Sequence, residues 1–84
     1  MKELKEGMLA KSLAGHDKGQ IYVIESIEGE YVYLADGKHR SLERTKKKNL
    51  KHIQPVKHIE VSCLCNETIK KVIKEYQLGQ QTGG

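Results

Sequence analysis

The first chemically distinctive stretch of the chain is a glycine-bounded turn at residues 15–19, Gly-His-Asp-Lys-Gly. A chain reversal alone needs only an Asn-Gly or Asp-Gly pair, so this turn is expected to display groups as well as to turn the chain. Glycine adopts left-handed backbone conformations without steric cost. We expect Asp17 to accept hydrogen bonds from nearby backbone N–H groups. His16 and Lys18 then point outward, and backbone N–H groups beside the glycines are free to meet phosphate oxygens.

Basic side chains are concentrated in residues 38–58, which hold eight Lys or Arg and one acidic residue, Glu43. This segment carries +7 in a chain of net charge +4, so the remaining residues sum to −3. Such an uneven distribution of charge favours an anionic partner, and a nucleic acid is favoured over a membrane surface. Within the segment, Lys46, Lys47 and Lys48 repel one another unless an anion lies nearby. Because lysine is a point charge on a flexible stem, contacts to a phosphate backbone are expected rather than reading of bases.

These two stretches define the predicted binding residues. The turn is built from Gly15, Asp17 and Gly19. The predicted phosphate contacts come from basic side chains in and around both stretches: Lys11, His16, Lys18, Lys38, His39, Arg40, Arg44, Lys46, Lys47, Lys48 and Lys51. Tyr31 and Tyr33 either stack on bases or pack against the helix or a neighbouring strand.

Other residue types give weaker chemical signals. Cys63 and Cys65 form a C-x-C pair, with His52 and His58 upstream. A structural zinc site needs four ligands and usually a C-x2-C spacing, so we expect reduced, buried cysteines and neither a metal nor a cofactor. The chain has no phosphate-binding loop, no glycine-rich dinucleotide motif and no G-x-S-x-G sequence, which predicts a protein that is not an enzyme.

Short strands are expected to position these groups. Apolar and β-branched residues predict the first three strands. Residues 21–24, the IYVI run, are apolar on both faces, which indicates a strand covered on two sides. Asp36-Gly37 predicts a two-residue hairpin, and a lysine-rich loop precedes a last strand that Pro55 ends. The five predicted strands cover residues 8–13, 20–27, 31–35, 38–42 and 50–54, with the loop at 43–49.

The last part of the chain predicts one amphipathic helix. Asn66 is expected to cap it and Gly79 to end it. Four apolar residues at helical spacing form one face: Ile69, Val72, Ile73 and Tyr76. Its charged residues nearly balance, so we expect the helix to pack on the sheet, over a core that small residues at positions 10 and 12 leave thin, rather than to bind a ligand. The predicted organisation is a single barrel domain at 1–58, a connection and helix at 59–78 and a disordered tail at 79–84.

The stretch GMLAKSLAGHDKG at residues 7–19, followed by IYVI, resembles the KOW motif, in which two strands flank a glycine and an x-Asp-Lys-Gly turn. YVYLADGKHR and the lysine-rich segment after it are similar to one KOW subgroup, the small bacterial KOW-domain RNA-binding proteins related to archaeal and eukaryotic large-subunit ribosomal protein fourteen-e. The resemblance covers about residues 4–54. Ala10 and Ser12 are smaller than the motif's usual first-strand residues. The resemblance implies a mainly β fold, an SH3-like five-stranded barrel followed here by the C-terminal helix.

The resemblance and the charge together predict an RNA-binding module associated with the ribosome or its RNA. Ribosomal proteins are further expected partners, and the free protein is expected to be a monomer. The alternative is an SH3-like protein-interaction module of the transcription or translation machinery. The N-terminus MKELKEGM has no apolar signal region, and no run approaches the roughly 18 apolar residues of a membrane span, which predicts a cytoplasmic protein without a membrane partner.

Overall fold

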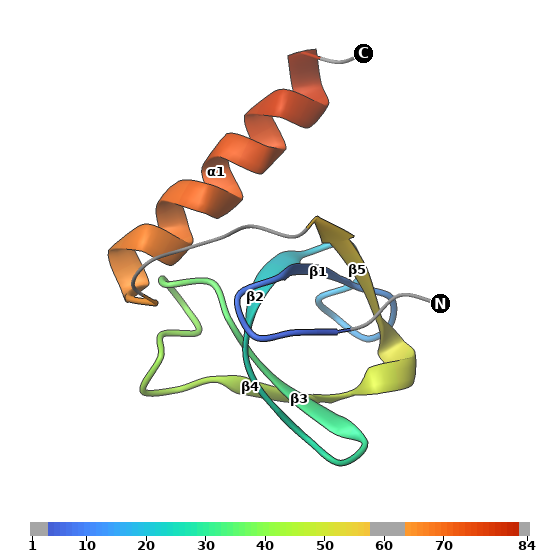
Figure 1. The fold of residues 1–84 in the computed structure, drawn as a ribbon. Helices are drawn as coiled ribbons and strands as arrows, with labels where there is room; N and C mark the ends of the chain where they lie inside the picture. Colours follow the sequence, from blue (N-terminus) through green and yellow to red (C-terminus); the bar gives the residue numbers. More distant parts are fainter. Residues whose placement is uncertain (1–3, 58–63, 83–84) are drawn as a thin grey trace.

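The computed structural model describes residues 4–57 and 64–82. It contains five strands, a 3-10 helix and an α-helix, in the order β1 (Leu9–Ser12), β2 (Ile21–Glu28), β3 (Tyr31–Ala35), β4 (Lys46–Asn49), η1 (Leu50–His52), β5 (Ile53–Lys57) and α1 (Asn66–Thr82). The strands form one antiparallel sheet with the order β4-β3-β2-β1-β5. Figure 1 shows the sheet strongly bent, with α1 to one side of it.

Two irregularities in strand register accompany the bending of the sheet. One lies between Leu9 and Ala10, where β1 pairs with β5, and the other lies between Ile24 and Ser26, where β2 pairs with β3. An extra residue on one strand of a pair bends that strand and increases its twist. The hydrogen-bonded order ends at β4 on one side and β5 on the other, and within the described residues no pairing joins these two strands. The sheet is therefore not closed into a complete barrel by its backbone hydrogen bonds.

The sheet has an apolar cluster on each face, because successive side chains of a strand point to opposite sides. The inner core contains buried residues of the bent sheet: Met8, Ala10, Tyr22, Ile24, Val32, Leu34 and Ile53. The outer core contains the alternate residues and the helix: Leu9, Ile21, Val23, Ala35, Ile69 and Ile73. The predicted two-sided burial of the IYVI run is therefore confirmed. The small residues Ala10 and Ser12 do not lie beneath α1, because it is their neighbour Leu9 that packs in the outer core.

The first three predicted strands are confirmed within one residue at each end. The predicted returning strand at 38–42 is wrong, because residues 36–40 close on themselves as a loop. The amide of Asp36 donates to the carbonyl of Arg40 at 2.8 Å. The carboxylate of Asp36 accepts from the amides of Lys38 and Arg40, each at 2.8 Å. A carboxylate that binds its own following amides stabilises a local turn in place of a strand ladder.

The predicted loop at 43–49 and the last strand at 50–54 are also revised. Lys46–Asn49 is a strand, β4, and Leu50–His52 is a 3-10 turn whose N-cap, Asn49, accepts a hydrogen bond from the amide of Lys51. Pro55 does not end β5, because it lies inside that strand opposite Ala10. Proline is tolerated there because β5 is an edge strand, where its missing N–H breaks no ladder bond.

The helix starts and ends differently from the prediction. The amide of Ile69 donates to the carbonyl of Cys65 at 2.9 Å, so Cys65 precedes the first helical residue, Asn66. The Asn66 side chain accepts instead from the amide of Leu42 at 2.8 Å and ties α1 to the connection between β3 and β4. Gly79 lies inside α1, which runs to Thr82, so the predicted disordered tail is wrong up to that residue. Residues 83 and 84 lie outside the described residues. The predicted apolar face is confirmed, with Ile69 and Ile73 buried and Val72 and Tyr76 partly buried against them.

Candidate nucleic-acid interface

The turn at residues 15–19 has the conformation that its glycines predict. Gly15 has φ 86° and Gly19 has φ 92°, both in the left-handed region. The turn is closed by its own backbone, since the amide of Lys18 donates to the carbonyl of Gly15 at 3.2 Å and that of Gly19 donates to the carbonyl of Ser12 at 2.8 Å. The amide of Gln20 donates to the carbonyl of Asp17 at 2.9 Å. These three N–H groups are used within the protein, so they are not the phosphate contacts that we predicted from the turn.

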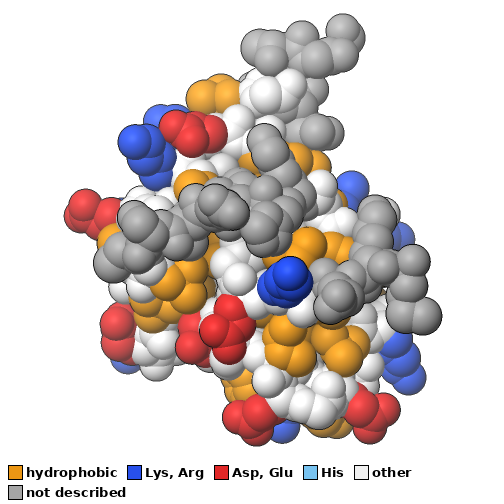
Figure 2. All heavy atoms as spheres, viewed as in Figure 1, with side chains coloured by type: hydrophobic (Ala, Val, Ile, Leu, Met, Phe, Trp, Pro, Cys, Tyr) orange, Lys and Arg blue, Asp and Glu red, His pale blue; other side chains and the backbone are white. Residues whose placement is uncertain are grey.

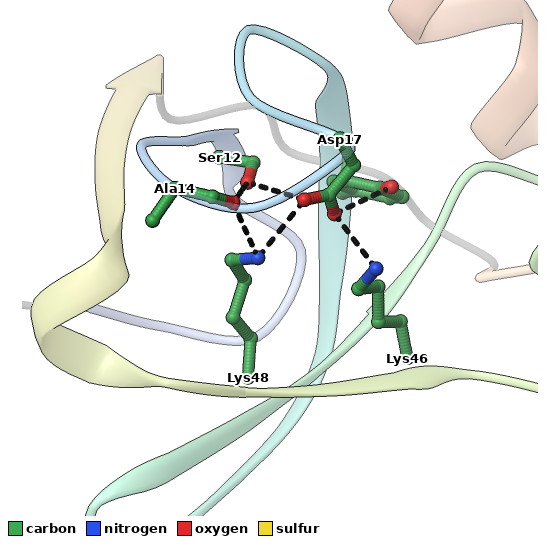
Figure 3. A network of polar contacts seen from close by, with 6 residues as sticks. Ser12, Ala14, Asp17, Lys46 and Lys48 are labelled. Carbon is green, nitrogen blue, oxygen red and sulfur yellow. Dashed lines mark hydrogen bonds and ion pairs between the residues drawn. The ribbon is translucent and has the colours of Figure 1, made fainter.

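The Asp17 side chain points back into the molecule, where it meets four other side chains (Figure 3). The Asp17 cluster consists of Asp17, Ser12, Tyr22, Lys46 and Lys48. One carboxylate oxygen, Oδ1, lies 2.9 Å from both Ser12 Oγ and Lys48 Nζ. The other, Oδ2, accepts from Tyr22 Oη at 3.0 Å and pairs with Lys46 Nζ at 3.2 Å. In the structure as described, all the partners of this carboxylate are side chains, so the predicted backbone N–H partners are replaced.

The alternation of strand β4 explains why two of the three consecutive lysines reach Asp17. Lys46 and Lys48 pair with Leu34 and Val32, whose side chains belong to the inner core, so the two lysines share that face of the sheet. Lys48 Nζ also donates to the carbonyl of Ala14 at 2.9 Å. The side chains of Lys48 and Asp17 are only 11% and 10% exposed, and that of Lys46 is 27% exposed. The carboxylate of Asp17 is therefore an anion within the protein that offsets the repulsion between Lys46 and Lys48.

The cluster changes the acidity of its members. Burial raises the pKa of Asp17, but the hydrogen bonds from Lys48, Ser12, Tyr22 and Lys46 outweigh burial and leave that pKa well below its ordinary value of 3.8. Burial, with the hydrogen bond to the Asp17 carboxylate, raises the pKa of Tyr22 to about 12. Asp17 is therefore a carboxylate at neutral pH that accepts from the neutral Tyr22 hydroxyl and forms ion pairs with Lys46 and Lys48.

Lys47 points to the other face of β4 and meets a tyrosine. Its Nζ lies 4.3 Å from the centre of the Tyr31 ring, within the range of a cation–π contact. Tyr31 is 41% exposed, and Tyr33 is partly buried. Tyr31 therefore contacts the neighbouring strand β4 through Lys47 and keeps much of its ring at the surface. Stacking of these rings on bases stays a prediction.

The remaining predicted binding residues are at the surface. Nine of the eleven basic residues have exposed side chains: Lys11, His16, Lys18, Lys38, His39, Arg40, Arg44, Lys47 and Lys51. Within residues 4–57 and 64–82 the only ion pairs are the two in the Asp17 cluster, so none of these nine is neutralised by a carboxylate. On the face drawn in Figure 2, Lys and Arg side chains are spread among acidic ones and form no continuous basic area.

Sequence reasoning missed several residues that the fold brings to these positions. Ser12 and Tyr22 complete the Asp17 cluster, and the small size of Ser12 leaves room for the carboxylate. Lys70 and Lys74 of α1 lie beside Lys38 and His39 around a common hollow. The spacing of these two lysines, one helical turn apart, indicates that they share one face of the helix. Sequence reasoning considered only the total charge of the helix, which is nearly balanced, and so did not identify them.

Of the two cysteines, the structure describes only Cys65. Cys65 is partly buried, and its Sγ lies 3.0 Å from Thr68 Oγ1 in the first turn of α1. Cys63 lies outside the described residues. Among the described residues, no group of three or more His, Cys, Asp or Glu side chains is placed to hold a metal ion.

The structure thus divides the predicted residues into a buried cluster that joins the turn to β4 and a set of exposed basic groups.

In residues 4–57 and 64–82, no helix combines the length and apolar character that crossing a membrane requires. Comparison of the chain with protein-family models finds no match, and comparison with curated proteins finds no significant relative.

Proposed function

We propose that this protein is a non-catalytic RNA-binding module that contacts the phosphate backbone through exposed basic side chains. The observation that carries the proposal is the set of nine exposed basic residues without carboxylate partners in the described structure. Surface cations that are not neutralised within a protein attract polyanions and release counterions when they bind phosphates. Lys46 and Lys48 are not part of this proposed surface, because Asp17 holds both.

The architecture supports an SH3-like barrel of the KOW type as the scaffold for this surface. The five-stranded antiparallel sheet is bent around an inner core, and η1 joins its two edge strands directly in the chain. The turn between β1 and β2 carries its glycines at the positions where the KOW motif places them, and Gly15 and Gly19 both have positive φ. Ribosome association and a cytoplasmic location extend the same proposal, and sedimentation of the protein with ribosomal particles in a sucrose gradient tests them.

RNA binding is tested by titrating a labelled RNA hairpin with the full-length protein at several salt concentrations. If about five phosphates are contacted, the slope of log K against log salt is roughly −3.5 to −4.5. Lys18→Gln is expected to weaken binding and to flatten the slope by roughly 0.7 to 0.9. Lys5→Gln is the matched control, because Lys5 is also exposed but lies outside the predicted set.

Two results would contradict the proposal. A flat response to salt excludes an electrostatic phosphate contact, and equal effects of the two substitutions exclude a localised surface. Binding to proteins of the transcription or translation machinery, without salt-dependent RNA binding, would favour the alternative of a protein-interaction module.

A further inference from the structure

A groove runs between α1 and the sheet, along the start of β2, and we call it the helix groove. One hollow of about 550 Å³ lies between the helix, the start of β2 and the 36–40 loop, with the buried side chains of Ile21 and Ile73 in its lining. A second hollow, of about 620 Å³, shares Ile21 and Gln77 with the first and continues to Lys11 and Tyr76. Each hollow has the size of a typical small-ligand pocket, about 300–1,000 Å³.

The charge of the first hollow is predominantly positive. Its lining includes three lysines, Lys38, Lys70 and Lys74, against one carboxylate, Asp36. One oxygen of that carboxylate accepts the amides of two residues in its own loop, which directs it toward the backbone. Lys70 and Lys74 stand one turn apart on the helix, an arrangement that costs free energy through like-charge repulsion. An anion in the hollow removes that cost.

The lining residues of α1 form a stripe of their own. Lys70, Ile73, Lys74 and Gln77 stand at i, i+3, i+4 and i+7, so they share one face of the helix. This stripe adjoins the apolar face that packs on the sheet, and Ile73 belongs to both. The near balance of charge over the whole helix therefore hides a local excess of positive charge at the groove.

The hollow is held in shape by close packing of the 36–40 loop on the helix. Gly37 has φ 78°, and a Cβ atom built there would overlap the carbonyl of Asn66 and the stem of Lys70. Asn66 is also fixed to the rest of the connection between β3 and β4, since its side chain accepts from the Leu42 amide at 2.8 Å and its Nδ2 lies 3.3 Å from Glu43 Oε1. Lys38 and Lys70 are thus mounted on two segments whose backbones are in contact, and the positive groups are brought together before any ligand binds.

We propose that the helix groove binds a single-stranded segment of RNA. One phosphate lies among Lys38, Lys70 and Lys74, and the attached nucleoside lies over Ile21 and Ile73. This inference rests on the proposed RNA-binding function and adds to it Lys70 and Lys74 of α1, which the sequence did not predict. A hollow of this size admits one nucleotide but not a duplex. Its combination of lysines, an apolar lining and the amides of Gln20 and Gln77 matches a nucleotide, which has a phosphate, an apolar ring face and polar edges.

The test uses the full-length protein and a fluorescein-labelled single-stranded U12 RNA, with binding followed by fluorescence anisotropy. Lys70→Gln and Lys74→Gln are compared with Lys71→Gln, which removes the same charge from an exposed position of the same helix outside the groove. Each groove substitution is expected to weaken binding about three- to tenfold and to reduce the salt slope by roughly 0.7, the value for one phosphate of a single strand. Lys71→Gln is expected to change the affinity less than twofold.

The outcomes separate this inference from the function on which it rests. If the wild type binds U12 and the RNA hairpin but all three variants bind U12 equally, the groove is overturned while RNA binding stands. If the wild type binds neither RNA, the proposed function itself fails. An unlabelled decamer of glutamate that displaces U12 from the wild type at equal charge concentration would show that the groove takes any polyanion and would overturn the nucleotide assignment.

Discussion

At the scale of single residues, the side-chain partners of Asp17 are a structural feature that the sequence analysis did not predict. Its carboxylate accepts from Ser12 and Tyr22 and pairs with two lysines from a strand that follows 29 or more residues later. A nearly buried charge is tolerated only when it is paired and its hydrogen bonds are satisfied. The turn at 15–19 is therefore both a surface feature, through exposed His16 and Lys18, and an anchor for β4.

Asp17→Asn is expected to make stability less dependent on acid pH. Because the pKa of Asp17 in the folded protein lies below its ordinary value of 3.8, the ionised carboxylate contributes its full stability above about pH 5. That contribution decreases as the pH falls below 3.8 toward the lowered pKa, since the unfolded chain then binds a proton that the folded chain does not. The variant is expected to lose about 1–3 kcal/mol at pH 7, because Lys46 and Lys48 are left without their partner.

Urea unfolding of both proteins from pH 7 to pH 2 measures this effect as the difference between their free energies of unfolding. The difference is expected to be constant above about pH 5 and to shrink below it. A difference that stays constant down to pH 2 would show that Asp17 is not held in its charged form by the cluster. Lys48→Gln and Lys47→Gln provide a matched pair, because of these two lysines only Lys48 contacts Asp17. Lys48→Gln is therefore expected to lower stability at pH 7 more than Lys47→Gln, which removes only the exposed contact with Tyr31.

At the scale of elements, the predictable strands are those whose apolar pattern is local. Apolar alternation and β-branched residues located β2 and β3 within one residue, because each carries apolar side chains into the cores. Strand β4 has the sequence KKKN and no apolar side chain to indicate it. It forms because its backbone pairs with β3 and because its lysines have partners on both faces. Lys46 and Lys48 pair with Asp17, and Lys47 lies over the ring of Tyr31. Both partners are distant in sequence, so no local window contains the reason for the strand.

The contact between the 36–40 loop and α1 explains a second failure of the local pattern. Asp36-Gly37 suggested a hairpin because glycine after aspartate is typical of tight turns. The glycine is needed for a different reason: it lets the loop approach the carbonyl of Asn66, a contact that depends on where the helix docks. The same contact shapes the helix groove, which is why Lys70 and Lys74 were absent from the predicted site.

Gly37→Ala is expected to destabilise the protein more than Gly29→Ala. Both glycines have positive φ, 78° and 58°, so each alanine bears a left-handed backbone cost of about 1–2 kcal/mol. Only at Gly37 does the added Cβ also collide with the backbone of α1, whereas nothing lies within 4 Å of a Cβ at Gly29. The extra cost is expected to be about 1–2 kcal/mol, or roughly 4–16 °C in melting temperature for a domain of this size. Equal melting temperatures for the two variants would show that the loop does not pack on the helix as described.

At the scale of the whole molecule, one sheet serves two cores, and only one of them is enclosed by the sheet itself. The sequence predicted that both faces of the IYVI run are covered and that the helix packs through Ile69, Val72, Ile73 and Tyr76, because these facts follow from residue spacing. Which strand residues meet the helix depends on the register, and here the helix covers Leu9 while Ala10 faces the inner core. The register is set by pairings across the sheet and was not available from the sequence.

The two-core arrangement predicts that the sheet does not remain soluble without its helix. Truncation after Cys65 removes α1 and exposes Leu9, Ile21 and Val23, which are at most 7% exposed in the whole protein. Contiguous exposed apolar surface promotes association. We expect the truncated protein to aggregate or to melt at a much lower temperature, with increased binding of the dye ANS. Truncation after Gly79 is the control, because it keeps Ile69, Ile73 and Tyr76.

Ile73→Ala tests the same dependence within the full chain. The side chain is 8% exposed and packs in the outer core, so its truncation is expected to cost roughly 2–4 kcal/mol of unfolding free energy. A loss of that size is a large part of the total stability of a small domain, about 5–15 kcal/mol at most. Lys71→Ala, on an exposed face of the same helix, is expected to change stability by less than about 0.5 kcal/mol. If the protein truncated after Cys65 melts like the full chain and Ile73→Ala is neutral, α1 does not stabilise the sheet, and the outer core is not a part of the folding unit.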